Sequence, residues 1–347
     1  MSKIKIGIVG LNFGKHIIKE IVEGPGREWL ELAAVCDIEQ AKAREHAQKH
    51  GVKAYFDIDA LLADRDIPAI GLFTGPVGRA DLIRRIVRAG KDVMTTKPFE
   101  LDPAAGLAVL KEARGMGRVV HMNSPGPLLP PDLLQVNAWR AQHQLGRPVG
   151  CRLDVWVSYR EKPDGSWYDD PEKCPAAPVF RLGIYLINDL VRLFGDATQV
   201  QILQSRIFTG RPTVDNAQLG ILFRDGTIAN IFASFCVKDG DFYRNSMVLN
   251  FENGTIYRNC GPARHTGAGV HTELALIMAD AENKRQLIAE AQVASGSGEY
   301  QWQAFHRAVR GEQFADEVTP EQVAAGLRVI QAMSRAIKAG GVAKVEG

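Results

Sequence analysis

The sequence predicts an α/β fold in two parts, a parallel sheet covered by helices on both faces and then an α+β domain with an open, mainly antiparallel sheet. Three observations predict it. A glycine-rich turn joins an apolar strand to an apolar helix near the start, strand and helix patterns alternate over residues 3–121, and strand patterns then follow one another after a proline-rich stretch at 123–131. The chain of 347 residues is long enough for two domains.

The glycine-rich turn contains Gly10, Asn12, Phe13 and Gly14. Glycine lets the backbone approach a pyrophosphate, and the free amides of the following helix bind that anion. Asn12 stands at the position of the middle glycine of the dinucleotide fingerprint. Because Asn tolerates a left-handed backbone, we expect the turn to be kept. The alternative is an ordinary buried strand–helix turn.

Asp37 follows the next predicted strand, residues 32–35. A carboxylate there can accept both hydroxyls of an adenosine ribose. It would repel a 2′-phosphate, and no basic residue follows it directly, although Lys42 and Arg44 lie further on. The sequence therefore predicts a Rossmann domain that binds NAD in preference to NADP.

The first domain is expected to span residues 1–122, with five strands and five helices in alternation. The strands are expected at 5–9, 32–35, 70–73, 92–95 and 119–121, and the helices at 14–22, 40–49, 58–62, 79–89 and 103–114. Alternation of this kind implies right-handed crossovers and a parallel sheet. Ligands of such sheets bind at the carboxyl ends of the strands.

The second domain is expected to span residues 123–347. Its helices are expected at 132–143, 183–193 and 319–339, its strands at 149–159, 200–209, 216–223, 227–238, 244–251 and 255–258, and a loop at 161–178. Asp225–Gly226 and Asn253–Gly254 are hairpin signals that favour antiparallel neighbours.

Composition excludes several classes of protein. The net charge is +2 with scattered Lys and Arg, so no nucleic-acid partner is expected. No apolar run is long enough to span a membrane, and the first strand begins too early to leave room for a signal peptide. The five widely spaced cysteines indicate reduced thiols of a cytoplasmic protein, and neither they nor the histidines have metal-ligand spacing, so no metal is expected.

The order of elements and five landmarks resemble the glucose–fructose oxidoreductase and inositol dehydrogenase family (Gfo/Idh/MocA) over essentially the whole chain. The landmarks are residues 7–14, 89–98, 165–167, 183–189 and 319–322. The resemblance implies an NAD(P)-dependent oxidoreductase that transfers hydride between a nicotinamide and a carbinol or carbonyl of a sugar, sugar acid or cyclitol.

Lys97 and Pro98 resemble the family's Glu-Lys-Pro motif, whose lysine reaches the reacting carbinol and the cofactor. A lysine at a strand end beside a cofactor loses hydration, which favours proton transfer. The alternative is a solvated lysine before a loop proline. Thr96 replaces the family's glutamate and can still hydrogen-bond the cofactor. The peptide bond between Lys97 and Pro98 is a candidate for the cis form.

Tyr185 resembles the residue that carries catalysis on the family's second domain, where many relatives have histidine. A phenol can relay the proton of a carbinol while hydride leaves, although a buried core tyrosine is the alternative. Asn188 and Asp189 follow at helical spacing and are expected to bind substrate hydroxyls. Asp189 could equally pair with Arg192.

Arg181 departs from the family pattern, in which aspartate precedes the catalytic position by four residues. Arginine accepts no hydrogen bond but clamps carboxylate or phosphate. Either the substrate is an acidic or oxidised sugar, or Arg181 pairs with loop acids such as Asp169 or Asp170. Both alternatives stay open.

The resemblance implies further contacts to the cofactor. Trp167 resembles a tryptophan whose loop closes over the cofactor, and the alternative is a cover for a small apolar patch. Asn123 resembles an asparagine that faces the nicotinamide. The other expected contacts follow the strand at 70–73, and they are Thr74, Gly75, Pro76 and Arg79, the last in place of the family's histidine.

Two other functions stay open because Thr96 and Arg181 depart from the family's polar residues. One is a catalytically silent regulatory protein that binds a dinucleotide, and the other is an NAD-assisted lyase or epimerase. We also expect a homodimer or homotetramer that assembles through the open face of the second sheet. The alternating residues 227–235 would otherwise leave an apolar face in water.

Overall fold

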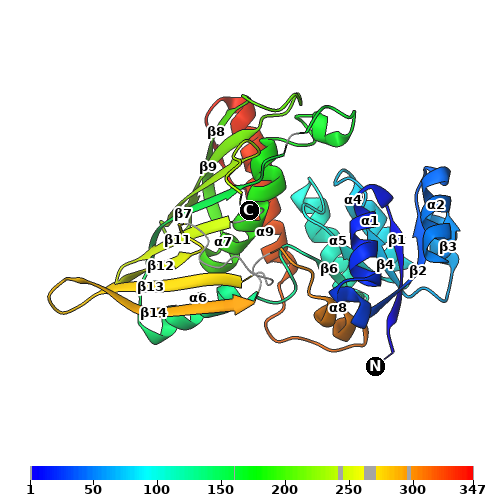
Figure 1. Ribbon diagram of the computed structural model, residues 1–347, viewed down its shortest axis with the longest axis horizontal. Coiled ribbons are helices and arrows are strands. Elements are labelled where there is room, and N and C mark those ends of the chain that lie inside the picture. The colour runs from blue at the N-terminus through cyan, green and yellow to red at the C-terminus, as the bar shows by residue number, and fades with distance from the viewer. Residues whose placement is uncertain (1, 160, 241–244, 262–270, 295–297, 347) are drawn as a thin grey trace. The chain divides into compact units, whose positions relative to one another are not determined.

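The chain forms two compact units (Figure 1). The computed structural model describes residues 2–159, 161–240, 245–261, 271–294 and 298–346. The first unit comprises Met1–Leu128 and Tyr300–Pro320, and the second comprises Leu129–Glu299 and Glu321–Gly347. The sequence predicted one domain boundary, after residue 122. The first unit extends to Leu128 and also includes the later segment Tyr300–Pro320.

The first unit contains the predicted parallel sheet, and the Rossmann architecture is confirmed. Its strand order is β3-β2-β1-β4-β5-β6, with every pairing parallel. The chain passes from β1 through β2 to β3 on one side of β1, and the strands β4 to β6 then follow on its other side. The strand order therefore reverses at β1, which makes its carboxyl end the switch point where ligands bind. The strands are β1 (Ile4–Val9), β2 (Leu30–Cys36), β3 (Lys53–Tyr55), β4 (Ala69–Leu72), β5 (Asp92–Thr95) and β6 (Val120–Met122).

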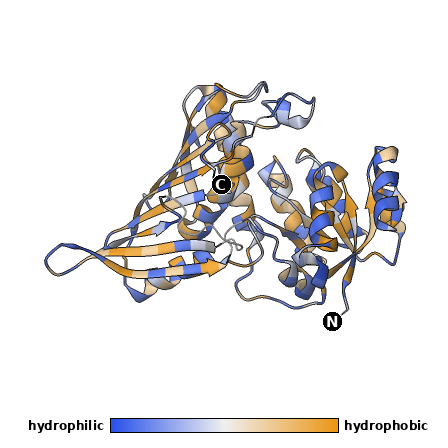
Figure 2. Ribbon diagram, in the orientation of Figure 1, coloured by the Kyte–Doolittle hydropathy of each residue, from blue (hydrophilic) through white to orange (hydrophobic). Residues whose placement is uncertain are grey.

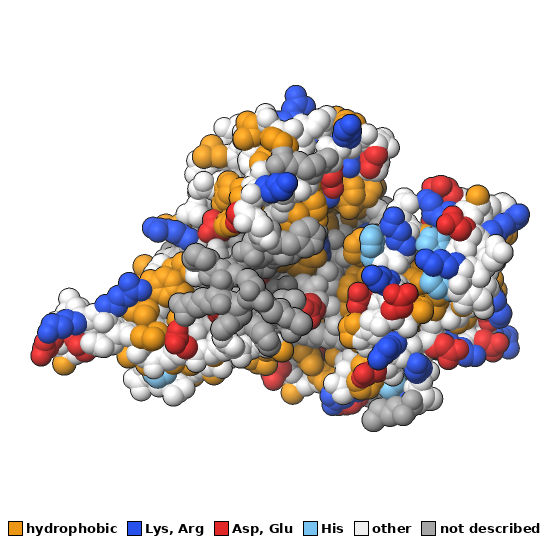
Figure 3. Space-filling model, in the orientation of Figure 1, with side chains coloured by type: hydrophobic (Ala, Val, Ile, Leu, Met, Phe, Trp, Pro, Cys, Tyr) orange, Lys and Arg blue, Asp and Glu red, His pale blue; other side chains and the backbone are white. Residues whose placement is uncertain are grey.

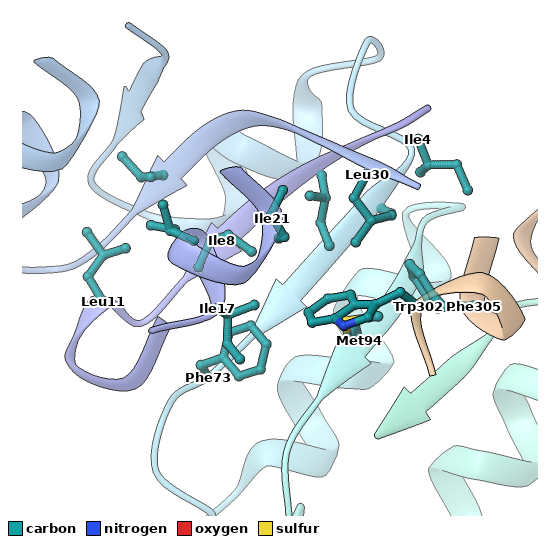
Figure 4. Packing of buried hydrophobic residues seen from close by; sticks show 14 of the residues in the cluster. Ile4, Ile8, Leu11, Ile17, Ile21, Leu30, Phe73, Met94, Trp302 and Phe305 are labelled. Atoms are coloured by element: carbon teal, nitrogen blue, oxygen red, sulfur yellow. The ribbon is translucent and has the colours of Figure 1, made fainter. Parts of the chain in front are cut away.

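The helices of the first unit bury apolar faces on this sheet. The helices are α1 (Leu11–Val22), α2 (Gln40–His50), α3 (Ile58–Ala63), α4 (Arg79–Arg88), α5 (Pro103–Gly115) and α8 (Trp302–Val309). Figure 4 shows Ile17 and Ile21 of α1 packed with Ile8 of β1 in one cluster, which Trp302 and Phe305 of α8 join. The late segment that carries α8 is therefore part of the Rossmann core. Sequence reasoning missed α8 and the short strand β3.

The glycine-rich turn differs from the expectation at Asn12. Helix α1 begins at Leu11 rather than at Gly14, so Asn12 lies in its first turn and is not in the left-handed region. Gly10 alone makes the turn, with φ of 85°. A Cβ on Gly10 would lie 2.8 Å from the carbonyl carbon of Phe73, and one on Gly14 would lie 2.8 Å from Ile8 Cγ2. Only glycine fits these two positions without a shift of the neighbours.

The second unit contains a nine-stranded sheet in the order β14-β13-β12-β11-β7-β10-β9-β8-β15. Its pairings are antiparallel except for β7 with β10, so the mainly antiparallel sheet is confirmed. Figure 2 shows hydrophobic residues recurring along its strands. The strands are β7 (Pro148–Trp156), β8 (Ala197–Ser205), β9 (Asn216–Phe223), β10 (Ile228–Ser234), β11 (Asn245–Phe251), β12 (Gly254–Arg258), β13 (His271–Ala279), β14 (Arg285–Ala294) and β15 (Val342–Lys344).

Three strands of this sheet were missed, namely β13, β14 and β15, and β8 ends earlier than expected. The buried carboxylate of Asp215 explains that end, because it accepts hydrogen bonds from the amides of Ile207, Phe208 and Thr209 at 2.7–3.0 Å. Because these amides donate to Asp215, they cannot pair with a neighbouring strand. Arg244, the first residue of the strand expected at 244–251, lies outside the described residues.

Three helices complete the second unit, α6 (Pro131–Gln142), α7 (Ile184–Phe194) and α9 (Pro320–Ala339). A π-helical segment, Val179–Gly183, leads into α7, which is buried along most of its length. Within the described part of the chain, none of the helices has the length and apolarity needed to cross a membrane. Figure 3 shows acidic and basic side chains interspersed on the visible surface of the described residues.

Candidate active site

The residues expected to bind the cofactor in the first unit gather at one edge of its sheet. They follow the carboxyl ends of β1, β2, β4, β5 and β6, which are neighbours in the sheet. These residues are Gly10, Asn12, Phe13, Gly14, Asp37, Thr74, Gly75, Pro76, Arg79, Thr96, Lys97, Pro98 and Asn123.

Asp37 connects the end of β2 to the start of α1. Its Oδ2 accepts a hydrogen bond from the Leu11 amide at 2.9 Å, and its Oδ1 accepts one from the Glu39 amide at 3.0 Å. Each carboxylate oxygen keeps a second lone pair. Asp37 is therefore fixed by the backbone and still able to accept hydroxyl groups.

A basic residue does lie close to the glycine-rich turn. Lys42 Nζ donates to Asn12 Oδ1 at 2.7 Å and also contacts Glu39 Oε1 at 2.7 Å. The charge of Lys42 is thus matched by Glu39. Phe13 is 40% exposed and its ring lies 5.9 Å from that of Phe73.

The loop after β5 holds Lys97 half-buried, and its bond to Pro98 is cis, as the sequence suggested. Asn123 Oδ1, at the end of β6, accepts from Thr96 Oγ1 at 3.2 Å and from the Lys97 amide at 3.4 Å. Asn123 therefore supports the lysine loop through its side-chain oxygen.

Arg79 is directed at the protein rather than at solvent. It is buried, and its guanidinium donates to the carbonyl of Thr96 at 2.7 Å, to that of Pro98 at 3.1 Å and to that of Thr74. The side chain therefore joins the loops that follow β4 and β5. Sequence reasoning expected a contact to the cofactor here and missed this arrangement.

Tyr185 is the half-exposed member of a buried stretch of α7, next to Leu186 and Ile187. Its ring packs on Gly298, where a Cβ would lie 2.7 Å from Tyr185 Cε1. Gly298 has φ of 107°, a second reason for glycine at that position. Tyr185 is thus packed on one side and accessible to solvent in the second unit.

Asn188 and Asp189 are both buried, at 5% and 4% exposure. Arg258 of β12 contacts Asp189 Oδ2 at 3.3 Å and Asp132 Oδ2 at 2.7 Å, and all three are buried. The partner of Asp189 in this cluster is therefore Arg258, a residue that the sequence analysis did not consider.

Arg181 pairs with a loop acid, although not with either expected one. It forms two bonds with Glu161, at 2.6 and 2.8 Å. Its guanidinium also lies 4.1 to 4.9 Å from three ring centroids, those of Tyr168, Phe235 and Tyr159. Burial alone would lower the pKa of Arg181, but the bonds to Glu161 raise it overall.

A second arginine, Arg211, holds the same loop. It contacts Asp169 at 2.6 Å, and Glu161 and Asp164 at 3.0 Å each, while Asp170 pairs with Lys173 at 2.9 Å. The bond from Arg211 lowers the pKa of the Asp164 carboxyl. The acids that were candidate partners of Arg181 thus have other partners.

Trp167 lies half-buried in this loop, in a 3₁₀ turn, Trp167–Asp169. Its ring lies 4.1 Å from that of Tyr168 and 6.2 Å, nearly edge-on, from that of buried Phe180. The contact with Phe180 anchors the loop to the π-helical segment.

The candidate metal ligands in the parts of the chain that the structure describes are the His, Cys, Asp and Glu side chains. No cluster of three or more His, Cys, Asp and Glu side chains there is arranged to hold a metal ion. Burial, with Asp57 and Asp37 nearby, raises the pKa of Cys36 to about 12, so its thiol is not a nucleophile at neutral pH.

Comparisons with known proteins define the class. Residues 4–124 match the oxidoreductase family with an NAD-binding Rossmann fold, and residues 133–257 match the GFO/IDH/MocA C-terminal domain. The chain therefore belongs to the Gfo/Idh/MocA family of NAD-binding oxidoreductases. The expected family membership is confirmed.

Individual relatives match over part of their length. The dehydrogenase aclE of Aspergillus oryzae is 27% identical over 219 residues, which is 60% of each chain. The inositol 2-dehydrogenase of Rhizobium meliloti is 35% identical over 109 residues, 31% of this chain and 32% of its own. An oxidoreductase structure from Desulfitobacterium hafniense has the same fold, with a TM-score of 0.79, 15% identity and coverage of 99% and 98% of the two chains.

Proposed function

We propose that this protein is an NAD-dependent dehydrogenase that transfers hydride between the nicotinamide and a carbinol or carbonyl carbon of a neutral polyol or sugar. The observation that carries the proposal is the pair of strand ends that present Asp37 and Lys97 at one edge of the parallel sheet. In this proposal Asp37 binds the adenosine ribose of the dinucleotide, and Lys97 lies beside its nicotinamide.

The first unit fits a dinucleotide at the turn after β1. Gly10 has a φ of 85° and packs against the backbone of Phe73, a position that only glycine fits. The tight turn it makes lets α1 begin at the carboxyl end of β1. In the proposed complex the amides that begin α1 bind the pyrophosphate, and Asp37 accepts the ribose hydroxyls. The nicotinamide supplies the hydride acceptor or donor.

Lys97 and Tyr185 manage the proton in this proposal. When a carbinol is oxidised, the Tyr185 phenolate accepts the hydroxyl proton, and the Lys97 ammonium stabilises negative charge on that oxygen. In the reverse reaction the Tyr185 phenol returns the proton. The two residues belong to different compact units, so their meeting at one substrate hydroxyl stays a prediction.

The substrate class follows from the partners of Arg181. Its charge is matched by Glu161 and its faces are covered by aromatic rings, so the argument for an acidic sugar loses its basis. A relative named inositol 2-dehydrogenase supports a neutral polyol. Polyols and aldoses are therefore the first substrates to test.

The test is turnover with a panel of polyols, aldoses and uronates, followed by NADH absorbance and by analysis of the sugars. We expect NADH to form with a neutral polyol or aldose. NADH binding without any turnover would instead support the silent regulatory protein. A changed sugar without net NADH would support the lyase or epimerase.

A further inference from the structure

Arg79 begins α4 and is 2% exposed, yet its guanidinium contacts three backbone carbonyls outside its helix. Two of these carbonyls, of Thr96 and Pro98, flank Lys97 on either side. The third, of Thr74, belongs to the loop after β4. One planar cation thus spans the ends of two neighbouring strands.

Glu100 lies in the segment after Pro98, and its side chain bonds in return to the start of α4. Its Oε2 accepts the amide of Ala80, the residue after Arg79, at 2.9 Å. Its Oε1 accepts the amides of Leu101 and Asp102 at 2.7 and 3.3 Å. The side chain of Arg79, the first residue of α4, therefore binds the loop that carries Lys97. The side chain of Glu100, from the segment after that lysine, binds the first turn of α4.

We propose that Arg79 and Glu100 form a clasp that positions Lys97 and the loop Thr74–Pro76 for the cofactor, without touching the substrate. This inference rests on the proposed function, because it gives the clasp its purpose. Both side chains are buried, at 2% and 4% exposure. An arginine has a fork of five donors, so it can bind several carbonyls at once, whereas lysine offers one point charge.

In this proposal the Arg79 guanidinium holds the two loops in their binding geometry before NADH arrives. Without the guanidinium, the carbonyls of Thr74, Thr96 and Pro98 lose a charged donor, and the two loops can move apart. Binding NADH must then order them again, and that cost appears as weaker affinity. Displacement of Lys97 by about 1 Å is enough to lower turnover by roughly 10²-fold.

The experiment measures NADH affinity by fluorescence and thermal unfolding for the wild type, Arg79→Met, Arg79→Lys and Glu100→Ala. Arg85→Met is the matched control, because Arg85 lies on the same helix and pairs with exposed Asp59 at 2.5 Å. We expect Arg79→Met and Glu100→Ala to weaken NADH binding about tenfold or more. Arg79→Lys should recover part of that loss, and Arg85→Met should bind as the wild type does.

Unchanged NADH affinity in a folded Arg79→Met protein would overturn the clasp, even if its melting temperature fell. An equal loss in Arg85→Met would also overturn it, because the effect would then belong to the helix. If the wild type itself bound no NADH, the proposed function would fail, and the clasp with it. Where a substrate is known, kcat should fall more than the substrate KM changes.

Discussion

We propose that Asp37 selects the cofactor, because its carboxylate follows β2 and is fixed by the backbone amides of Leu11 and Glu39. We predict that Asp37→Ala weakens NAD binding far more than NADP binding, since only NAD has a free adenosine 2′-hydroxyl to lose as a partner, and the lost charge repels the 2′-phosphate of NADP. The measurement is the ratio of the two dissociation constants. Asp57→Ala, at an exposed helix cap nearby, is the control, and an unchanged ratio in Asp37→Ala would count against the assignment.

Lys97 and Tyr185 are expected to act on one hydroxyl. We predict that Lys97→Ala and Tyr185→Phe each lower kcat by ~10²–10⁴-fold, the usual contribution of a general acid or base. NAD affinity should stay nearly intact in Tyr185→Phe, because the phenol serves the substrate. Tyr257→Phe, on β12, is the matched control and should leave kcat unchanged. A Tyr185→Phe protein with wild-type kcat would make Tyr185 a packing residue.

At the level of elements, the segment from Glu161 to Asp169 is held by two arginines, Arg181 and Arg211. Burial alone would raise the pKa of Glu161, but its bonds to both arginines lower it overall. A carboxyl with a lowered folded-state pKa stabilises the protein above its unfolded pKa of about 4.3, and that stability is lost as pH falls through the folded value.

We therefore predict that Glu161→Gln lowers the free energy of unfolding by about 1–3 kcal/mol at neutral pH. The difference from the wild type should shrink as the pH falls below about 4. Urea denaturation at several pH values measures it, with exposed Glu282→Gln as the control. A difference that stayed constant down to the acid limit would show that the ionised carboxylate is not responsible.

The sequence predicted the elements whose periodicity and glycine turns were clear, including the Rossmann strands, α7 and α9. It missed α8, although Trp302, Phe305 and Val309 have helical spacing, because a return to the first unit has no local signal. It also missed β13 and β14, whose turn depends on Asp280 accepting amides of Glu282 and Lys284.

The places of the candidate site residues after the strands could be read from the sequence, whereas their contacts within the protein could not. The residues after each parallel strand could be named, since the fold places ligands there. The partners of these residues within the protein are remote in the sequence, and they could not be predicted. The contacts of Arg79 with Pro98, of Asp189 with Arg258 and of Arg181 with Glu161 depend on tertiary packing, which has no local signal in the sequence.

At the scale of the whole molecule, the second sheet has a face that its helices leave open. Ile228 on β10 is 56% exposed, and Phe232 on the same side is half-buried between Asp154 and Gln218 of the neighbouring strands. A monomer would leave these apolar side chains in water, and a contact between subunits would bury them. We propose that the protein forms a homodimer or homotetramer through this face.

Light scattering should therefore give a mass above that of one 38.0 kDa chain at micromolar concentration. Ile228→Glu should shift the mass towards the monomer, because it places a charge in the proposed apolar contact. Leu134→Glu, at an exposed position of α6, is the control and should not change the mass. A wild-type protein of monomer mass would contradict this prediction.

Hydride transfer between a bound nicotinamide and a carbinol carbon can be followed by the transfer of deuterium from the substrate to the cofactor. Wild-type protein and Lys97→Ala are incubated with NAD⁺ and perdeuterated inositol or an aldose deuterated at its carbinol carbons, and the reduced cofactor is analysed by mass spectrometry. We predict wild-type NADH that carries one deuterium, with its formation slowed ~10²-fold or more in Lys97→Ala. Tight NADH binding without deuterium transfer from any polyol or aldose would contradict it.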